Sequence, residues 1–337
     1  MTVKNRVLSQ LEANRGEDIS GEALARELGV SRAAVWKAIN SLKEQGYPIT
    51  ASTNKGYRLD ETSDILSKEG IALYLSPSAK SDELSVFDEI DSTNLEAKRM
   101  ALNGTKTAVI VANSQTIGRG RFGRTFYSPS GCGIYMSILL TPDKEQLSEI
   151  VMLTTAAAVA VCRAVSCLSE ASPKIKWVND IYLNGKKTCG ILSEAIADIE
   201  SGSIQSVVVG IGINFKKGSE PLPDDIADIA GAFFDKTAPI SRNRLAAQVV
   251  NELFDMLPNL SKREFLAEYR ERSMLIGEEI VYSRGNEKYA AIAEGIDDDG
   301  GLMVLFEDGR RETLRSGEVS VRPRSMAATL PNAGGAK

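Results

Sequence analysis

The sequence predicts an α+β protein of several domains, with an N-terminal winged helix-turn-helix, a central mixed β-sheet covered by helices, and a small SH3-like β-barrel at the C-terminal end. Its 337 residues exceed one ordinary domain of roughly 100–200 residues. Helical segments come first, then alternating strand and helix patterns, then closely spaced short strands. We place the domains at 1–64, 65–275 and 276–324, followed by a disordered tail at 325–337.

The composition limits the chemistry that the chain can perform. Hydrophobic residues make up 43% and charged residues 25%, as in soluble globular proteins. Histidine is absent, which excludes imidazole general bases and His-ligated zinc. The chemistry left to the chain uses lysine, arginine, carboxylates, backbone amides and a loosely held Mg²⁺, for which we expect no dedicated protein site.

The apolar run from Ile150 to Cys162 is shorter than the roughly 20 residues that cross a bilayer, so we predict a buried helix. The first residues do not form a signal peptide, and we expect a cytoplasmic protein without membrane contact. The four cysteines form no C-x-x-C pattern and are predicted to be reduced core residues; they are Cys132, Cys162, Cys167 and Cys189.

The first sixty residues carry the pattern of a helix-turn-helix. Ser20 can cap a helix that ends at Gly29, and Ser31 can cap a second helix. Val35 and Ile39 lie on one face of that second helix, while its other face carries hydrogen-bond donors and flat groups.

A short hairpin with its turn at 54–56 follows as a wing. Residues 1–60 hold 9 Lys and Arg against 7 Asp and Glu, which permits DNA contact. The alternative is a structural or protein-docking unit, but the basic face favours DNA in the major groove. The predicted DNA-binding residues are Ser31, Arg32, Ala33, Trp36, Lys37, Asn40, Lys55 and Arg58.

The central region predicts strands at 107–113, 134–140, 174–177, 188–197 and 206–213. A helix is predicted at 149–168, another begins at Ser241, and a third begins at Ser261 with Glu264 in capping-box spacing. The tail region predicts five short strands at 279–282, 289–293, 302–306, 313–314 and 319–321.

The segment Gly118–Arg124 carries the strongest functional signal. Arg119, Arg121 and Arg124 alternate with glycines, which let the backbone approach a ligand while arginine binds carboxylate and phosphate bidentately. We expect this loop to be mobile until an anionic ligand orders it. The alternative is a solvated arginine–glycine loop that grips nucleic acid without specificity.

Two further segments support a site. Lys174–Asp180 brings a cation, an amide and a carboxylate to a strand end, and Val208–Asn214 is a glycine-rich buried strand. The second is not a dinucleotide fingerprint, because the third glycine and the following helix are missing.

Several motifs in this order resemble the biotin–protein ligases, specifically the bifunctional kind that act as biotin operon repressors. They are D-S-T-N at 91–94, S-Q-T-x-G-R-G-R-x-G-R at 114–124, K-W-x-N-D at 176–180, K-x-x-G-I-L at 187–192, G-I-G-I-N at 210–214 and G-E-V-S-V-R at 317–322. The chain departs from the family at Val178, where proline is usual, and at Phe126, where tryptophan is usual. The resemblance implies the class II synthetase-like biotin/lipoate ligase fold.

The resemblance also implies two reaction steps. ATP and biotin form biotinyl-5′-AMP, with Mg²⁺ arriving on ATP, and a lysine of an acceptor protein then takes the biotinyl group. The acceptor is the biotin carboxyl carrier protein of acetyl-CoA carboxylase. The other implied partners are operator DNA of biotin synthesis genes and a second copy of the chain in a ligand-promoted homodimer.

Site residues carry over by motif position. The catalytic candidates are Lys176, Arg121 and Asp180. The biotin-binding candidates are Ser92, Thr93, Asn94, Gln115, Gly118, Arg119, Arg121, Lys176 and Gly190, with Gly210 and Gly212 leaving room for the flat bicycle. The nucleotide-binding candidates are Arg119, Arg121, Arg124, Phe126, Asn179, Asn214, Glu318 and Arg322. Two alternatives stay open: a DNA-binding sensor without ligase activity, and a ligase for lipoate.

Overall fold

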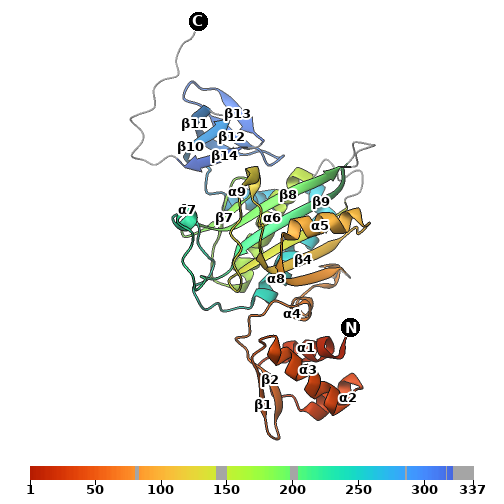
Figure 1. The fold of residues 1–337 in the computed structure, drawn as a ribbon. Helices are drawn as coiled ribbons and strands as arrows, with labels where there is room; N and C mark the ends of the chain where they lie inside the picture. The colour runs from red at the N-terminus through yellow and green to blue at the C-terminus, as the bar shows by residue number, and fades with distance from the viewer. Residues whose placement is uncertain (80–82, 142–149, 198–203, 285–286, 316, 322–337) are drawn as a thin grey trace.

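The computed structural model describes residues 1–79, 83–141, 150–197, 204–284, 287–315 and 317–321. An N-terminal helical part, a central sheet with helices and a C-terminal sheet follow one another along the molecule (Figure 1). Among these residues, none of the helices has the length and apolar character needed to cross a membrane. The predicted disordered tail at 325–337 lies outside the described residues.

The N-terminal part is a winged helix-turn-helix, as predicted. Its elements are α1 (Val3–Ala13), α2 (Gly21–Leu28), α3 (Arg32–Glu44), β1 (Ile49–Ser52) and β2 (Gly56–Leu59). Ser20 Oγ accepts a hydrogen bond from Ala23 N at 3.0 Å, and Ser31 Oγ accepts one from Ala34 N at 3.2 Å. Gly29 has φ +63°, a left-handed conformation that ends α2. The three cap predictions are confirmed.

The central part is built on a seven-stranded mixed sheet in the order β3-β4-β5-β9-β8-β7-β6. Only β3 and β4 pair in parallel among these neighbours. The strands are β3 (Leu84–Ile90), β4 (Ala108–Gln115), β5 (Gly133–Leu140), β6 (Lys174–Lys176), β7 (Asp180–Leu183), β8 (Lys186–Ala197) and β9 (Ile204–Asn214). The five predicted strands are present; β3 and β7 were not predicted.

The strands alternate their side chains between the two faces of this sheet. Apolar side chains point to both faces, and helices cover both. Ile110 packs with Ala97 of α5 (Thr93–Leu102), whereas Val109 and Val111 pack in the larger core with α6 (Ile150–Leu168) and α8 (Arg242–Met256). The predicted buried helix α6 is therefore a core element. The other α-helices in the described residues of this part are α4 (Lys68–Ala72), α7 (Asp224–Ala227) and α9 (Phe265–Arg272).

Two expectations about this part are wrong. The helix expected to begin at Ser261 begins at Phe265, and Ser261 lies in a 3-10 segment over Leu257–Lys262. Glu264 is the N-cap but makes no side-chain cap bond, because Arg263 at φ +58° interrupts the helical path. Cys167 is exposed and Cys132 half-buried, so the prediction of core cysteines holds only for Cys162 and Cys189.

The C-terminal part is a five-stranded antiparallel sheet in the order β13-β12-β11-β10-β14. Its strands are β10 (Glu279–Arg284), β11 (Glu287–Ile296), β12 (Leu302–Leu305), β13 (Arg311–Leu314) and β14 (Glu318–Val321), which confirms the five predicted strands. Trp177 Nε1 donates to Gly300 O at 2.8 Å and so joins this sheet to the central part.

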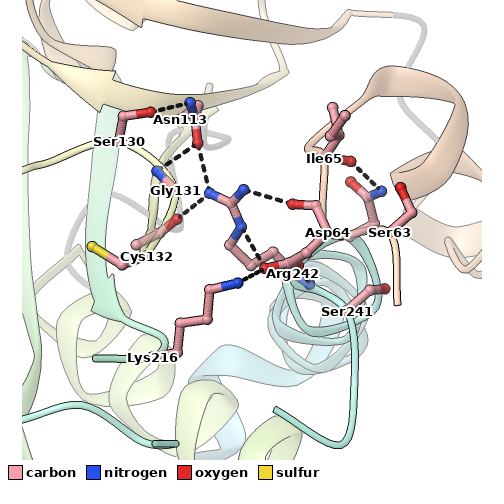
Figure 2. A network of polar contacts seen from close by, with 12 residues as sticks. Ser63, Asp64, Ile65, Asn113, Ser130, Gly131, Cys132, Lys216, Ser241 and Arg242 are labelled. Carbon is pink, nitrogen blue, oxygen red and sulfur yellow. Dashed lines mark hydrogen bonds and ion pairs between the residues drawn. The ribbon is translucent and has the colours of Figure 1, made fainter. Parts of the chain in front are cut away.

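A polar network joins the segment after β2 to the central part (Figure 2). Arg242, only 4% exposed, donates from Nη2 to Asp64 O at 2.6 Å, and its backbone N–H donates to Asp64 Oδ1 at 2.9 Å. Lys216 Nζ lies 2.6 Å from Asp64 Oδ2. Arg242 Nη1 reaches Asn113 Oδ1 at 2.7 Å and Gly133 O at 3.1 Å. The chain at the boundary predicted near residue 64 is therefore anchored to the central part by buried charge.

Candidate active site

A cavity of about 270 Å³ opens over the central sheet, between the arginine loop (Gly118–Arg124) and strands β8 and β9. It brings together most of the residues predicted from the motifs. They are Ser92, Thr93, Asn94, Gln115, Arg119, Arg121, Arg124, Phe126, Lys176, Asn179, Asp180, Gly190 and Asn214. One cavity thus gathers side chains that lie far apart in the sequence.

Buried polar groups form the floor of the cavity. Ser92, Thr93 and Asn94 stand at the start of α5 and are 2%, 3% and 5% exposed. Gln115, at the end of β4, accepts the Thr93 N–H on Oε1 at 2.9 Å and donates from Nε2 to Ser128 Oγ at 3.0 Å. These bonds hold neutral donors and acceptors in fixed directions, a surface suited to a neutral polar ligand.

Asn94 is held by a charged pair beneath the floor. Its Nδ2 donates to Glu194 Oε2 at 2.7 Å, and Lys98 Nζ lies 2.6 Å from Glu194 Oε1. Burial raises the pKa of the Glu194 carboxyl, but the hydrogen bonds from Lys98 and Asn94 more than offset this, so its pKa lies below the usual value. The carboxyl is therefore ionised at neutral pH. Sequence reasoning did not identify Glu194 or Lys98.

The glycines of β8 and β9 at this point all line the cavity; they are Gly190, Gly210 and Gly212. A Cβ on Gly212 would lie 2.5 Å from the Phe126 ring, and one on Gly210 would lie 2.2 Å from Asn94 Oδ1. The two glycines of β9 therefore also let Phe126 and Asn94 pack against the strand. That these glycines leave room for a flat ligand stays a prediction.

The arginine loop is closed by its own backbone bonds. Gly120 N donates to Arg124 O at 2.7 Å, and Phe126 N donates to Gly118 O at 3.0 Å. Gly118 does not line the cavity, but a Cβ there would lie 2.3 Å from Phe126 O, so this close approach requires glycine. Phe122 has φ +56° and is 68% exposed at the tip. Mobility of the loop without an anionic ligand stays a prediction.

Arg119 and Arg124 line the cavity, and three further cationic side chains line it beside Asn179 and Asp180. Arg121 Nη1 donates to Asn179 Oδ1 at 2.8 Å, and Asn179 Nδ2 donates to Ile191 O at 2.9 Å. Lys187 Nζ lies 2.7 Å from Asp180 Oδ1, and Lys176 also lines the wall. Such a cluster suits a ligand with several negative charges.

Lys187 lies within one of the family motifs but is not among the predicted site residues. Its signal in the sequence was its place at the start of the K-x-x-G-I-L stretch. Pairing between β7 and β8 brings it to Asp180, and no local pattern shows that pairing.

One wall of the cavity is apolar, and it was not predicted from the sequence. Leu222, Ile226, Ile229 and Ala230, from α7 and its flanks, line the cavity. Asn214 Nδ2 donates to Gly231 O at 2.9 Å and holds this segment near the end of β9. Residues 217–231 have no strand or helix periodicity from which this wall could have been predicted.

Two nucleotide candidates come from the C-terminal part. Gly317 and Val319 line the cavity, which brings the start of β14 to its rim, and Glu318 stands between them in the chain. Arg322 lies outside the described residues. Within the described part of the chain, no three His, Cys, Asp or Glu residues are grouped so as to hold a metal ion.

The predicted DNA-binding residues lie on the surface of the N-terminal part. Trp36 is 59% exposed, and Lys37 beside it is also exposed. Of the full set, Ser31, Arg32, Ala33, Trp36, Lys37, Lys55 and Arg58 are exposed, and Asn40 is half-buried. Val35 and Ile39 on the opposite face are buried, as predicted.

Family models match all three parts of the chain. The Biotin/lipoate A/B protein ligase family matches residues 86–214, an HTH domain matches 3–58, and the Biotin protein ligase C terminal domain matches 275–322.

Known proteins of similar length match as well. The Bifunctional ligase/repressor BirA of Bacillus spizizenii is 34% identical over 91% of this chain and 95% of its own length. The protein of the same name from Escherichia coli is 30% identical over 91% and 94%. The solved biotin protein ligase from Aquifex aeolicus in complex with biotin and ATP superposes with a TM-score of 0.58 at 29% identity, over 72% of this chain and 99% of that one. The chain therefore belongs to the family of bifunctional biotin–protein ligase/repressor proteins.

Proposed function

We propose that this chain is an ATP-dependent biotin–protein ligase that also represses transcription of biotin synthesis genes. The observation that carries the proposal is the single cavity in which a neutral polar floor at Thr93 and Gln115 meets the cationic cluster of Arg121, Lys176 and Lys187. A ligand with an uncharged polar head and an anionic tail that reacts with ATP fits this division. Biotin has both, since its ureido ring is neutral and its valerate chain ends in a carboxylate.

The first reaction step joins biotin to AMP. A biotin carboxylate oxygen attacks the α-phosphorus of ATP, the bond to the β-phosphate oxygen breaks, and pyrophosphate leaves. Negative charge builds on the α-phosphate oxygens, and we assign Lys176, Lys187 and Arg121 to stabilise it. The residues mainly position charged groups, so a chain without histidine suffices.

The second step transfers the biotinyl group. A lysine amine of the carrier protein attacks the carbonyl carbon of biotinyl-5′-AMP, AMP leaves with the bonding pair, and the nitrogen loses a proton to solvent water. Asp180 forms an ion pair with Lys187 over 2.7 Å. We therefore assign Asp180 to position Lys187, in preference to accepting the proton of the incoming amine.

The nucleotide would lie between the arginine loop and the apolar wall. We assign Arg124, Phe126, Asn179 and Asn214 to this half of the cavity, and we keep Glu318 and Arg322 as nucleotide-binding residues because the motif resemblance implies them. The apolar side chains Leu222, Ile226 and Ile229 would cover the adenine base. Mg²⁺ would arrive with ATP and bind mainly through phosphates and water.

The repressor activity would use the exposed face of α3 and the wing. Trp36, Lys37 and Arg32 would contact operator DNA, with Lys55 and Arg58 against the phosphate backbone. Biotinyl-5′-AMP would act as corepressor by promoting a homodimer, which places two winged helices on two half-sites. The acceptor would be the biotin carboxyl carrier protein of acetyl-CoA carboxylase, in the cytoplasm.

One experiment tests the enzyme and its alternatives. ATP–pyrophosphate exchange is measured with biotin and with lipoate, followed by transfer of labelled biotin to a carrier domain. We expect exchange with biotin but not with lipoate, followed by transfer of the labelled biotin to the carrier domain. Exchange with lipoate alone would make the chain a lipoate ligase. Operator binding without exchange on either acid would make it a sensor that lacks ligase activity.

A further inference from the structure

We infer that Glu194, acting through Asn94 and Ser137, sets the direction of the hydrogen bonds on the cavity floor, so that the Thr93 hydroxyl faces the ligand as an acceptor and selects a ligand that offers an N–H there. The inference rests on the proposed function, because biotin's cyclic urea supplies that N–H. Glu194 and Ser137 are positioning residues, since neither is assigned contact with substrate.

The direction begins at Glu194. An ionised carboxylate can only accept hydrogen bonds. Lys98 Nζ at 2.6 Å keeps a cation beside Glu194, and Asn94 Nδ2 lies 2.7 Å from Glu194 Oε2. The Asn94 amide must therefore turn its NH2 group toward Glu194 and its carbonyl oxygen away, toward Ser137 on β5. The glycine at 210 makes room for this, because a Cβ there would lie 2.2 Å from Asn94 Oδ1.

The Ser137 hydroxyl links Asn94 to Thr93 and so determines the direction of the hydrogen bond at Thr93. It is fully buried, and its Oγ lies 2.6 Å from Asn94 Oδ1 and 2.8 Å from Thr93 Oγ1. The amide oxygen of Asn94 can only accept, so the single hydroxyl proton of Ser137 must go to Asn94. The short contact between the two hydroxyls then needs the proton of Thr93. Thr93 therefore donates to Ser137.

Gln115 leaves this assignment intact. Its Oε1 already accepts the Thr93 N–H at 2.9 Å, and the Thr93 Oγ1 contact to the same atom is longer, at 3.3 Å. The Gln115 amide is oriented separately, because Nε2 donates to Ser128 Oγ at 3.0 Å and Ser128 donates to Phe126 O at 2.9 Å. The Thr93 proton is thus committed to Ser137, and its lone pairs remain for a ligand.

The resulting floor places an acceptor, Thr93 Oγ1, beside a donor, the second N–H of Gln115. A cyclic urea offers an N–H beside a C=O and matches this pair. The dithiolane ring of lipoate has neither group and would leave both polar atoms unsatisfied. The polarity of the floor thus discriminates between the two acids by hydrogen bonding.

The test uses one substitution to reverse the direction of the hydrogen bonds between residue 194 and Thr93, and a second substitution to restore it. In Glu194→Gln, the amide oxygen of the new glutamine stays beside Lys98 and its NH2 group faces Asn94. The side-chain amide of Asn94 must then flip, so that its oxygen accepts from this NH2 group. Adding Asn94→Asp supplies an oxygen that accepts from both the new amide and Ser137, which restores the original direction. We expect the single variant to raise the biotin KM about tenfold with kcat nearly unchanged, and the double variant to recover most of that loss.

Controls separate this idea from general damage and from failure of the proposed function. Glu96→Gln, a half-buried glutamate of α5 that pairs with Arg99, should leave the biotin KM unchanged. If Glu194→Gln does not fold, Ser137→Ala breaks the last link instead, and the same KM effect is expected. An unchanged KM in the single variant, or a double variant no better than it, overturns the inference. Absence of biotin-dependent exchange in the unmodified protein overturns the proposed function instead.

Discussion

Arg121 donates a hydrogen bond from Nη1 to Oδ1 of Asn179 over 2.8 Å, and this bond ties the arginine loop to the segment that connects β6 and β7. Asn179 is itself held by Ile191 O at 2.9 Å. The loop is thus anchored to the cavity wall at a position where three arginines alternate with glycines.

Asn179→Ala should release this anchor. We expect trypsin to cleave within Gly118–Arg124 several-fold faster in the variant, because cleavage follows local opening, and biotin with ATP should suppress cleavage in the unmodified protein. Asn103→Ala, at an exposed asparagine after α5, is the matched control. Equal cleavage rates in the two variants would show that Asn179 does not hold the loop.

Lys187→Met should slow the first reaction step. The change removes a cation from the cavity and leaves Asp180 without its 2.7 Å ion pair. We expect ATP–pyrophosphate exchange to fall by roughly 10²–10³-fold, the usual cost of losing one charge-stabilising group. Lys174→Met, at an exposed lysine of β6, should keep full exchange. If exchange in Lys187→Met stays within twofold of the unmodified rate, Lys187 takes no part in the first reaction step.

Gly212→Ala should displace Phe126. The added Cβ would lie 2.5 Å from the ring, and overpacking of this kind costs roughly 1–3 kcal/mol. We expect the ATP KM to rise, because Phe126 lines the cavity. Gly218→Ala is the control, since its Cβ would meet Cys132 Sγ at an ordinary 3.4 Å. A normal ATP KM with lowered stability would limit Phe126 to packing.

Lys37→Ala should weaken binding to operator DNA without changing exchange. A phosphate contact contributes to affinity through counterion release, so the slope of log affinity against log salt should fall by about one. Lys262→Ala removes an exposed lysine from the central part and should change neither affinity nor slope. An unchanged slope in Lys37→Ala would place the DNA contact elsewhere on the winged domain.

Local features could be predicted from the sequence because they depend on neighbouring residues. Ser20 and Ser31 cap helices through bonds to backbone N–H groups three residues away. The glycine at 29 adopts the left-handed conformation that ends α2. Five of the seven strands of the central sheet were predicted, whereas β3 and β7 were not. The order of the motifs brought most cavity residues into one set.

Long-range contacts could not be predicted in the same way. Asp64 and Arg242 are 178 positions apart, and neither lies in a pattern that indicates the other. The pairing of β7 with β8 brings Lys187 to Asp180, yet β7 is four residues long. The capping-box spacing of Ser261 and Glu264 fitted a helix start, but the backbone at Arg263 overrides it.

The Asp64–Arg242 joint should carry much of the stability of the connection between the winged and central parts. Arg242→Met would leave the Asp64 carboxylate with Lys216 and the backbone N–H of residue 242, and would remove the donor to Asn113 Oδ1 and Gly133 O. Breaking a buried charge pair from one side costs about 3–5 kcal/mol, so urea unfolding should show a lower free energy.

The control for this joint is Arg244→Met, an exposed arginine two positions further along α8. It should lose less than about 1 kcal/mol, as exposed charges do. Proteases should also cut near Asp64 faster in Arg242→Met, because the chain there loses the guanidinium that binds its carbonyl oxygen. Equal unfolding free energies in the two variants would mean that the joint is held by other contacts, such as those between α1 and α4. Arg242 does not line the cavity, so exchange activity measured on the folded variant should be retained.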